Sequence, residues 1–512
     1  MNFKRLTYIC IALLLLSLLV VSGASAQDPG LPGSGWFTTF TLQNPGSGTA
    51  NFSLDANQST RNNTADTSAT GNGCTVDGGA SVIHNPNANN LGDNRIGFGE
   101  GQGCKTVDNL ADGFEGGVVV TSDAPLAAVV SVGNNSPGSS GTASAFYQGV
   151  DGANADTTVN FPVAKKAFGG NTTTFYVQAV ADANVTVSYS AAPSSQVAAP
   201  SDQTIGAIPA GSTAVVIIPG GDGFFGGASA TSSTGAIVGS VIEHPTSGTA
   251  AYALSTRGSA PAEADTTVFA PVIKNDFSGG TTALVIQAVG GDVTVDVDFS
   301  RTNSIPDTLT CNGTTSGVSI SEGATVVVGG PNDLNLPASF ANGCFGSAVV
   351  TVAGGSGQVV ATVNEVSGLG RAVYSGFPQS AASQSVAVPL VKEEFFNGRT
   401  AVVVQAVGDS GTTTKITANY VTSGGAASTC TSSSPCGVVP ANGGAGDDST
   451  NGGAAVNFRQ LNNFSSQYTA STLPPVGTNN AVTVASDTLP VVVIAQEAVT
   501  GLDVKNYEGF GQ

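Results

Sequence analysis

The segment TTTFYVQAV, residues 172–180, decides the fold because its apolar core and its glutamine recur along the chain. It is rich in β-branched and aromatic residues, which is typical of a strand. Its copies are TTFTLQN at 38–44, TTALVIQAV at 281–289 and TAVVVQAV at 400–407. A strand motif that occurs four times indicates a fold built from repeated β units.

The glutamine of the motif sets the size of the repeat. Successive glutamines are separated by 135, 109 and 118 residues, so each repeat is as long as a domain. These glutamines are Gln43, Gln178, Gln287 and Gln405. We place repeat 1 at residues 27–152, repeat 2 at 153–260, repeat 3 at 261–380 and repeat 4 at 381–512.

Further strands are predicted in every repeat. After the motif, polar and apolar residues alternate, as at Val185, Val187 and Tyr189, and this period of two predicts a half-buried strand. The second half of each repeat has two strand-like runs around a turn, which predicts a β-hairpin. The four hairpin segments are 118–132, 228–242, 348–363 and 482–495.

Each repeat is also expected to have a closing strand with a tyrosine, and three repeats begin with an opening strand that contains proline. The tyrosines are Tyr147, Tyr252, Tyr374 and Tyr507. The opening strands are FPVAKKAF at 161–168, APVIKNDF at 270–277 and VPLVKEEF at 388–395. About seven short strands per repeat predict an all-β protein of four tandem immunoglobulin-like β-sandwiches.

The first 26 residues read as a signal peptide. Lys4 and Arg5 precede an apolar run at residues 9–21, and Ala24-Ser25-Ala26 is a small-residue cleavage pattern. The alternative is a membrane anchor, but the run is short for a span of about 20 apolar residues. We expect cleavage after Ala26 and a secreted or cell-surface product without a transmembrane anchor.

The charge of the chain limits its partners. Only 10% of the residues are charged, and the formal net charge is −19. With 16 Lys and Arg residues against 35 acidic ones, the chain lacks the basic surface that nucleic acids require. We therefore expect no nucleic-acid partner.

Six cysteines of the exported part form three pairs within repeats. An oxidising compartment favours disulfides, whereas the alternatives are free thiols or a metal site. No histidine or CxxC spacing accompanies any pair, so we expect disulfides. The predicted pairs are Cys74–Cys104, Cys311–Cys344 and Cys430–Cys436.

The sequence offers little catalytic material, and we expect no catalytic, cofactor-binding or metal site. His84 and His244 stand next to proline-containing turns, which indicates loop histidines. Three acidic segments could bind a cation or act as acids, but each is better explained as a solvated face or loop. They are the strand with Asp292, Asp296 and Asp298, the loop 151–156, and GGAGDD at 443–448, which resembles the start of a calcium-binding nonapeptide.

The recurring glutamines and tyrosines have two interpretations. The glutamines could form a ligand site, but their place at a strand end beside apolar residues favours a structural role in which the amide bonds to turn backbone. The tyrosines could form a binding platform, but they are better explained as residues at the edge of the core. Trp36 is the only tryptophan, and no cluster of aromatic residues suggests a sugar platform.

Three motifs carry a resemblance to a known class of proteins. The opening at Phe161 to Lys165, the strand at Thr172 to Gln178 and the segment at Thr121 to Val130 resemble tandem β-sandwich repeats of bacterial secreted surface proteins. That class includes adhesin, filament and cell-envelope proteins. The resemblance implies a fold and an extracellular place, and it implies no catalytic residue.

These observations predict a non-enzymatic structural or adhesive protein of the bacterial surface or extracellular matrix. Its expected partners are copies of itself or other cell-surface components. The alternative is a set of carbohydrate- or calcium-dependent binding modules.

Repeat 1 lacks an obvious opening strand, since only DPGLPGS precedes Gly35 and Trp36. Either the exposed edge accepts a strand from another molecule, or repeat 1 is a cap covered by its own N-terminal segment or loops.

Overall fold

We analysed a computed structural model of the chain. The structure describes residues 31, 36–59, 69–84, 106–107, 114–134, 143–246, 253–301, 310–330, 335–367, 370–395, 398–408, 412–422, 427–430, 437–440, 455–457, 477–499 and 503–511. In these ranges the chain is almost entirely antiparallel β-structure, with short 3₁₀ turns and no α-helix. The all-β prediction is confirmed. The proposed signal peptide lies outside the described residues.

The strands recur in a fixed order. Repeat 1 has β1 (Trp36–Gln43), β2 (Ala50–Gln58), β3 (Ala69–Val76), β4 (Ser81–His84), β5 (Thr106–Val107), β6 (Gly116–Ser122), β7 (Ala127–Asn134) and β8 (Ala143–Gln148). Repeat 2 has β9 (Thr158–Lys166), β10 (Asn171–Ala179), β11 (Ala183–Ala191), β12 (Gln203–Ile208), β13 (Thr213–Ile217), β14 (Phe224–Ser232), β15 (Ile237–Pro245) and β16 (Leu254–Arg257).

Repeats 3 and 4 follow the same order. Repeat 3 has β17 (Thr267–Asn275), β18 (Gly280–Val289), β19 (Val293–Arg301), β20 (Gly313–Ile320), β21 (Thr325–Gly329), β22 (Cys344–Gly355), β23 (Gln358–Ser367), β24 (Gly370–Ser375) and β25 (Phe377–Pro378). Repeat 4 has β26 (Ser385–Phe395), β27 (Gly398–Ala406), β28 (Thr413–Thr422), β29 (Ala427–Cys430), β30 (Gly437–Pro440), β31 (Ala455–Asn457), β32 (Thr478–Ser486), β33 (Val491–Val499), β34 (Asp503–Glu508) and β35 (Phe510–Gly511).

Two kinds of sheet alternate along the chain. The first kind contains the glutamine motif, in the orders β4-β1-β7-β8, β13-β10-β15-β16 and β21-β18-β23-β24. The second kind has the orders β5-β3-β2-β6, β12-β11-β14-β9 and β20-β19-β22-β17-β25. In repeat 4 a short pairing of β26 with β27 joins the two kinds into one sheet. Within repeat 2, apolar residues of both sheets form one core, which is a sandwich-like packing.

The predicted hairpins are wrong. In repeats 1 to 3 the two strands of each segment lie in different sheets: β6 pairs with β2, whereas β7 pairs with β1 and β8. The turn between them crosses the core from one sheet to the other. The sequence pattern did not show this because a crossing turn and a hairpin turn use the same residue types.

The sequence also missed the strands β3, β12, β20 and β30, which pair with the alternating strand of each repeat. In β12 and β20 most residues are exposed or half-buried on both faces. Such strands lack the period-two pattern that reveals a strand with one buried face.

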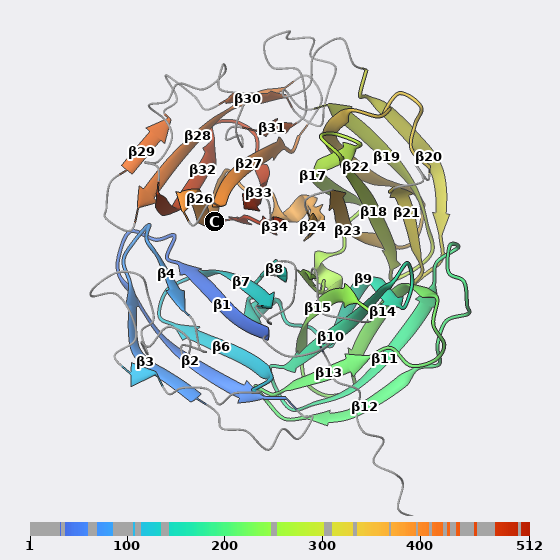
Figure 1. The fold of residues 1–512 in the computed structure, drawn as a ribbon, viewed down its shortest axis with the longest axis horizontal. Coiled ribbons are helices and arrows are strands. Elements are labelled where there is room, and N and C mark those ends of the chain that lie inside the picture. Colours follow the sequence, from blue (N-terminus) through green and yellow to red (C-terminus); the bar gives the residue numbers. More distant parts are fainter. Residues whose placement is uncertain are drawn as a thin grey trace, which may run out of the picture.

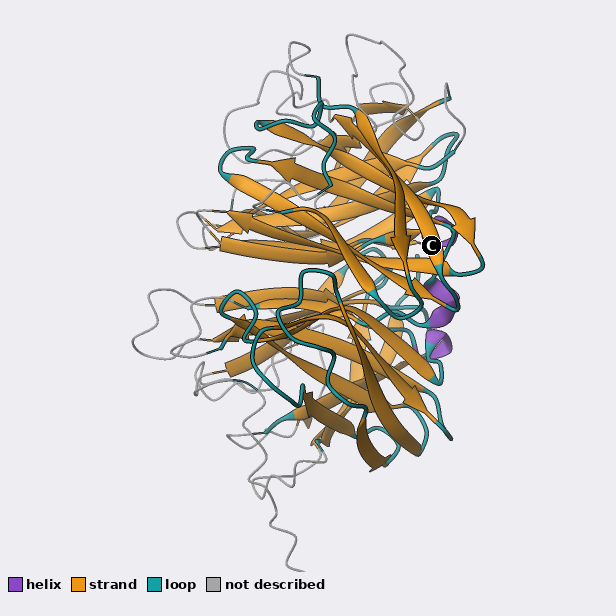
Figure 2. Cartoon of the chain, turned by 90° about the vertical axis from the view of Figure 1, so that its right-hand side faces the viewer, coloured by secondary structure: helices purple, strands orange, loops and turns teal. Residues whose placement is uncertain are grey.

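The four repeats stand side by side around a common centre and close into a ring (Figure 1). Strands β8, β16, β24 and β34, here called the axial strands, lie at the middle of the ring, and each contacts the next. The 3₁₀ turns η2 (Gly152–Asn154), η3 (Pro261–Glu263) and η4 (Gln379–Ala381), which come just before the opening strands of repeats 2, 3 and 4, lie along one side of the molecule (Figure 2).

Each repeat packs the outer face of its first sheet on the second sheet of the preceding repeat. Between repeats 2 and 3, Val163 and Phe225 pack against Val285. The ring closes where Phe146 of repeat 1 meets Tyr507 of repeat 4, edge to face, with ring centroids 5.8 Å apart. The sequence analysis did not predict these contacts between repeats.

A closed ring predicts a compact particle in solution. We expect small-angle scattering of residues 27–512 to give a radius of gyration of roughly 23–26 Å, the value for a compact chain of this length. A string of separate sandwiches would give a clearly larger radius and an elongated distance distribution, and that result would contradict the ring.

Candidate functional site

The boundaries between repeats and the axial strands hold the polar side chains that the fold brings together. The recurring glutamines lie at these boundaries. Gln287 of repeat 3 is fully buried, and its Nε2 donates to the carbonyl oxygen of Ala228 in repeat 2 at 3.3 Å and to that of Gly323 at 3.2 Å. Gln405 of repeat 4 donates to the carbonyl of Ala348 in repeat 3 at 3.4 Å.

These contacts refine the predicted structural role of the glutamines. Bonds to the turn backbone occur, as at Gly323, and Gln178 donates to the carbonyl of Gly211 at 3.0 Å. The glutamine also reaches the backbone of the preceding repeat, which the sequence did not indicate. A glycine makes room for it: a Cβ on Gly227 would lie 2.7 Å from Gln287 Nε2, and one on Gly117 would lie 2.5 Å from Gln178 Nε2.

A lysine–glutamate pair with a buried glutamate recurs in repeats 2, 3 and 4. The lysine ends the proline-containing part of the opening strand, and the glutamate lies on the strand that pairs with the glutamine motif. The Nζ–Oε1 distances are 2.8 Å for Lys165–Glu243, 2.6 Å for Lys274–Glu365 and 3.0 Å for Lys392–Glu497. The glutamates are 4%, 2% and 0% exposed, so breaking a pair would leave a buried charge.

A threonine holds the lysine backbone at each of these pairs. Its hydroxyl accepts from the lysine N–H at 3.0 Å in all three repeats. The threonine also stands directly opposite the glutamate in the sheet. These threonines are Thr173, Thr282 and Thr400. The opening strand is thus fixed to the first sheet by both its backbone and its side chain.

Repeat 1 replaces the ion pair by apolar residues. The register places Val132 opposite Thr38, where the other repeats have glutamate opposite threonine. Val132 is buried in a cluster with Leu31, Trp36 and Ile242. Repeat 1 has neither the lysine nor the glutamate. Because both charges are absent, no buried charge is left without a partner.

At the boundary between repeats 3 and 4 the ion pair continues into a network. Gln496 of repeat 4 accepts from Lys274 Nζ at 3.2 Å and donates to Glu365 Oε2 at 2.8 Å. All three side chains are buried. A glutamine can bridge the pair because its amide offers both a donor and an acceptor.

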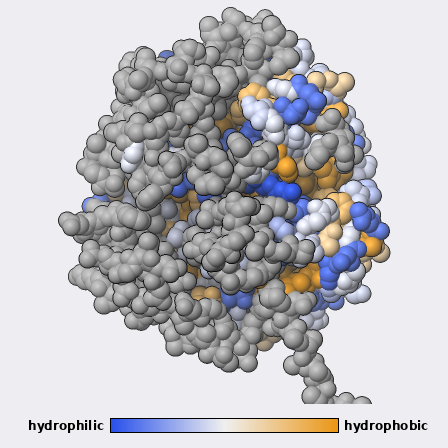
Figure 3. Space-filling view, viewed as in Figure 1, coloured by the Kyte–Doolittle hydropathy of each residue, from blue (hydrophilic) through white to orange (hydrophobic). Residues whose placement is uncertain are grey.

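The axial strands carry a second set of polar contacts between repeats. Arg257 of repeat 2 donates through Nε to Gln148 Oε1 of repeat 1 at 2.9 Å and forms an ion pair with Glu263. Glu508 of repeat 4 accepts from the backbone N–H of Ser375 in repeat 3. Hydrophilic residues are visible near the middle of the face shown in Figure 3.

The closing tyrosines bind the backbone of the opening strands. The hydroxyl of Tyr374 accepts from the N–H of Val272 at 3.0 Å and donates to its carbonyl at 2.8 Å. Tyr507 makes the same contacts with Leu390. Burial raises the pKa of Tyr374 and Tyr507 well above the ordinary value.

The other two predicted tyrosines differ. Burial raises the pKa of Tyr147 to about 12, while its hydrogen bond to Ser240 of repeat 2 acts in the opposite direction. Tyr252 lies outside the described residues. The register gives Thr256 the place that Tyr374 has in repeat 3.

The two histidines end strands rather than stand in loops, so the loop prediction is wrong for both. His84 is the last residue of β4. His244 is buried in β15, with Nε2 3.1 Å from the hydroxyl of Thr174 and Nδ1 2.9 Å from the carbonyl of Pro245. Because a carbonyl only accepts, Nδ1 carries the hydrogen and Nε2 accepts from the threonine. Burial lowers the pKa of His244.

The acidic segments bond to their own surroundings. On β19, Asp296 accepts from the N–H of Gly317, and Asp298 accepts from the hydroxyl of Thr314. Asp292 accepts from the N–H of Glu322 at 2.8 Å. These three carboxylates fix the edge strand β20 and the turn that follows it, and they are the side chains expected on a solvated face.

The loop 151–156, another candidate cation site, also uses its carboxylates to bond to its own backbone. Asp151 accepts from the N–H of Ala153 at 2.9 Å, and Asp156 accepts from that of Thr158 at 3.2 Å. The segment 443–448 lies outside the described residues. Within the described ranges, no three His, Cys, Asp or Glu residues are grouped as a metal site would require.

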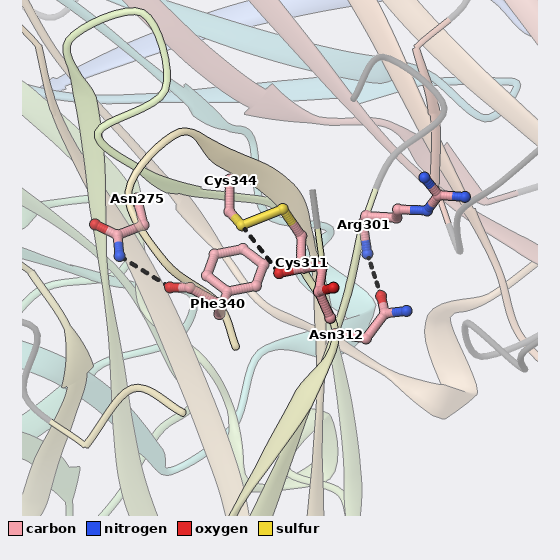
Figure 4. The surroundings of a disulfide bond; sticks show 7 residues. Asn275, Arg301, Cys311, Asn312, Phe340 and Cys344 are labelled. Carbon is pink, nitrogen blue, oxygen red and sulfur yellow. Dashed lines mark hydrogen bonds between the residues drawn. A yellow bond between two sulfur atoms is a disulfide. The ribbon is translucent and has the colours of Figure 1, made fainter. Parts of the chain in front are cut away.

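One predicted disulfide is present in full. Cys311 and Cys344 are bonded, with their Cα atoms 5.5 Å apart, and join the segment before β20 to the start of β22 (Figure 4). Cys74 is buried and disulfide-bonded, but its predicted partner Cys104 lies outside the described residues. The side chains of Cys430 and Cys436 lie outside them as well.

Comparisons with protein-family models and with the sequences of curated proteins found no match. In its described part, the chain has no apolar helix of the length that crosses a membrane.

The ion pairs lead to a stability prediction. Glu243→Val leaves the half-buried Lys165 without its partner and should lower the free energy of unfolding by about 2 kcal/mol. Adding Lys165→Leu, which imitates the apolar arrangement around Val132, should restore most of that loss. Urea denaturation of both variants measures the difference, and equal losses in the single and double variants would contradict the coupling.

The buried histidine leads to a pH prediction. The folded state binds the proton less readily than the unfolded state, so protonation favours unfolding. Stability should fall as the pH drops below about 6.5, the ordinary pKa of histidine, by up to about 1.4 kcal/mol per pH unit, and should level off below the folded-state pKa. His244→Gln should remove this component. An unchanged pH slope in that variant would contradict the assignment.

Proposed function

We propose that the protein is a non-enzymatic structural or adhesive protein of the bacterial cell surface or extracellular matrix. In this proposal the four repeats are immunoglobulin-like sandwiches, and the closed ring is a rigid body that presents its loops and edges to partners. The partners are copies of the protein or other cell-surface components.

The observation that carries the proposal is the use of buried charge. The lysine–glutamate pairs bind opening strands to first sheets, and the network of Lys274, Glu365 and Gln496 binds repeat 3 to repeat 4. The tyrosine hydroxyls and the buried histidine are engaged with backbone and neighbouring side chains as well. These groups stabilise the architecture, as expected where rigidity is the function.

The proposed extracellular location is supported by independent observations. The disulfide Cys311–Cys344 suits an oxidising compartment. The positive residues, apolar run and small-residue pattern at the start of the sequence support export.

Expression of the full chain in a bacterial host tests the export step. We expect the protein outside the cytoplasm with Gln27 as its N-terminal residue, identified by mass spectrometry, and Lys4→Glu/Arg5→Glu should retain it inside the cell. A full-length cytoplasmic product would contradict the proposal. Glycan-array binding and calcium titration of thermal stability are the accompanying measurements, and specific micromolar sugar binding would favour the carbohydrate-binding alternative.

A further inference from the structure

Among the described strands, the second sheet of repeat 1 ends one strand earlier than its counterparts. In repeats 2, 3 and 4 the opening strand pairs with the strand equivalent to β6: β9 with β14, β17 with β22 and β26 with β32. In repeat 1, β6 pairs with β2 on one side, and no described strand pairs with its other edge. This edge is the one nearest the middle of the ring (Figure 1).

Two apolar side chains of β6 are partly uncovered. By strand pairing, Val120 is equivalent to Ala230, Val350 and Val484 of the other repeats. Val118 lies two residues earlier, on the same face of β6. Both valines are only partly buried. Their equivalents are at most 1% exposed: Ala228, Ala230, Ala348, Val350, Val482 and Val484.

Repeats 2, 3 and 4, in which the opening strand is present, show what kind of segment fits beside β6. The opening strand supplies apolar residues that enter the core on both sides of a proline, as Val159, Phe161 and Ala164 do in repeat 2. Its other edge pairs with residues after the axial strand, as β17 does with β25. In repeat 1 the residues after the axial strand β8 are Gly149 and Val150. The open position therefore lies between β6 and these two residues.

A mature chain that begins at Gln27 would have too few residues ahead of Leu31 for a complete opening strand. If cleavage follows Ala26, four residues precede Leu31, whereas β9 and β17 have nine residues each. Leu31 itself packs with Trp36 against Val132, where the other repeats have the lysine–glutamate pair. Leu31 thus lies where the other repeats have the last part of the opening strand.

We propose that the inner edge of β6 is an acceptor site for an extended segment of a second polypeptide. The segment adds one antiparallel strand, and its apolar residues at alternate positions cover Val118 and Val120. Its sequence follows the pattern of the chain's own opening strands, of which TVNFPVAKK at 158–166 is the model. This inference rests on the proposed role as a surface protein, because it names how a partner joins the ring.

The strand pairing in repeat 2 also predicts the register of the added strand. In repeat 2, Asn160 is the cross-strand partner of Ser229, whose equivalent in repeat 1 is Val119. Val119 is 37% exposed, so Val119→Cys removes no core contact. A peptide of residues 158–166 with Asn160→Cys, activated as a thiopyridyl disulfide, should place its sulfur next to this cysteine.

The test compares rates of disulfide formation with the mature protein, residues 27–512, in its Val119→Cys form. We expect this peptide to react at least about tenfold faster than a Phe161→Asp version, because docking raises the effective concentration of the sulfur. The matched protein control is Val180→Cys, which is 47% exposed and lies in a turn of repeat 2, and it should react with both peptides at one low rate. Circular dichroism and melting temperature confirm that both variants are folded.

Equal rates with both peptides would overturn the proposal, as would equal rates at both cysteines. Either result would mean that an opening-strand segment does not dock at this edge. Because the measurement uses purified protein, it is independent of export. A negative result therefore leaves the proposed function standing, whereas a cytoplasmic product would reject that function without affecting the acceptor site.

Discussion

The structure depends on one close approach: the glutamines of repeats 3 and 4 reach the backbone of the repeat before them. Gln287 and Gln405 donate to carbonyl groups across a boundary, and Gly227 keeps the backbone near enough for Gln287 to do so. A side chain at that glycine would push the two sheets apart. The apolar contacts, the polar network and the axial strands all require the spacing that this approach sets.

The strands with one buried face could be predicted from the sequence, because alternation at positions such as Val185, Val187 and Tyr189 records that face directly. Which strands pair could not be predicted. A turn between two apolar runs has the same composition whether it returns within a sheet or crosses to the other one. Strands β12 and β20 were missed because neither of their faces is consistently buried.

The polar contacts of the candidate site could also be predicted only in part. The sequence showed the glutamines and the opening-strand lysines as recurring features, but Glu243, Glu365 and Glu497 were missed. A comparison of the second halves would have revealed a glutamate at one place in three repeats, with Val132 in the fourth. The closing of the ring leaves no local pattern, because it depends on residues as distant as Phe146 and Tyr507.

The contact between the first and last repeats changes how the repeats share their stability. In an open array the terminal units have one neighbour each and can fray alone, since stability is a sum of unit and nearest-neighbour terms. Here every repeat has two neighbours, so detaching any one of them breaks two boundaries at once. The ring should therefore unfold as a single cooperative unit, although its sequence reads as a row of separate domains.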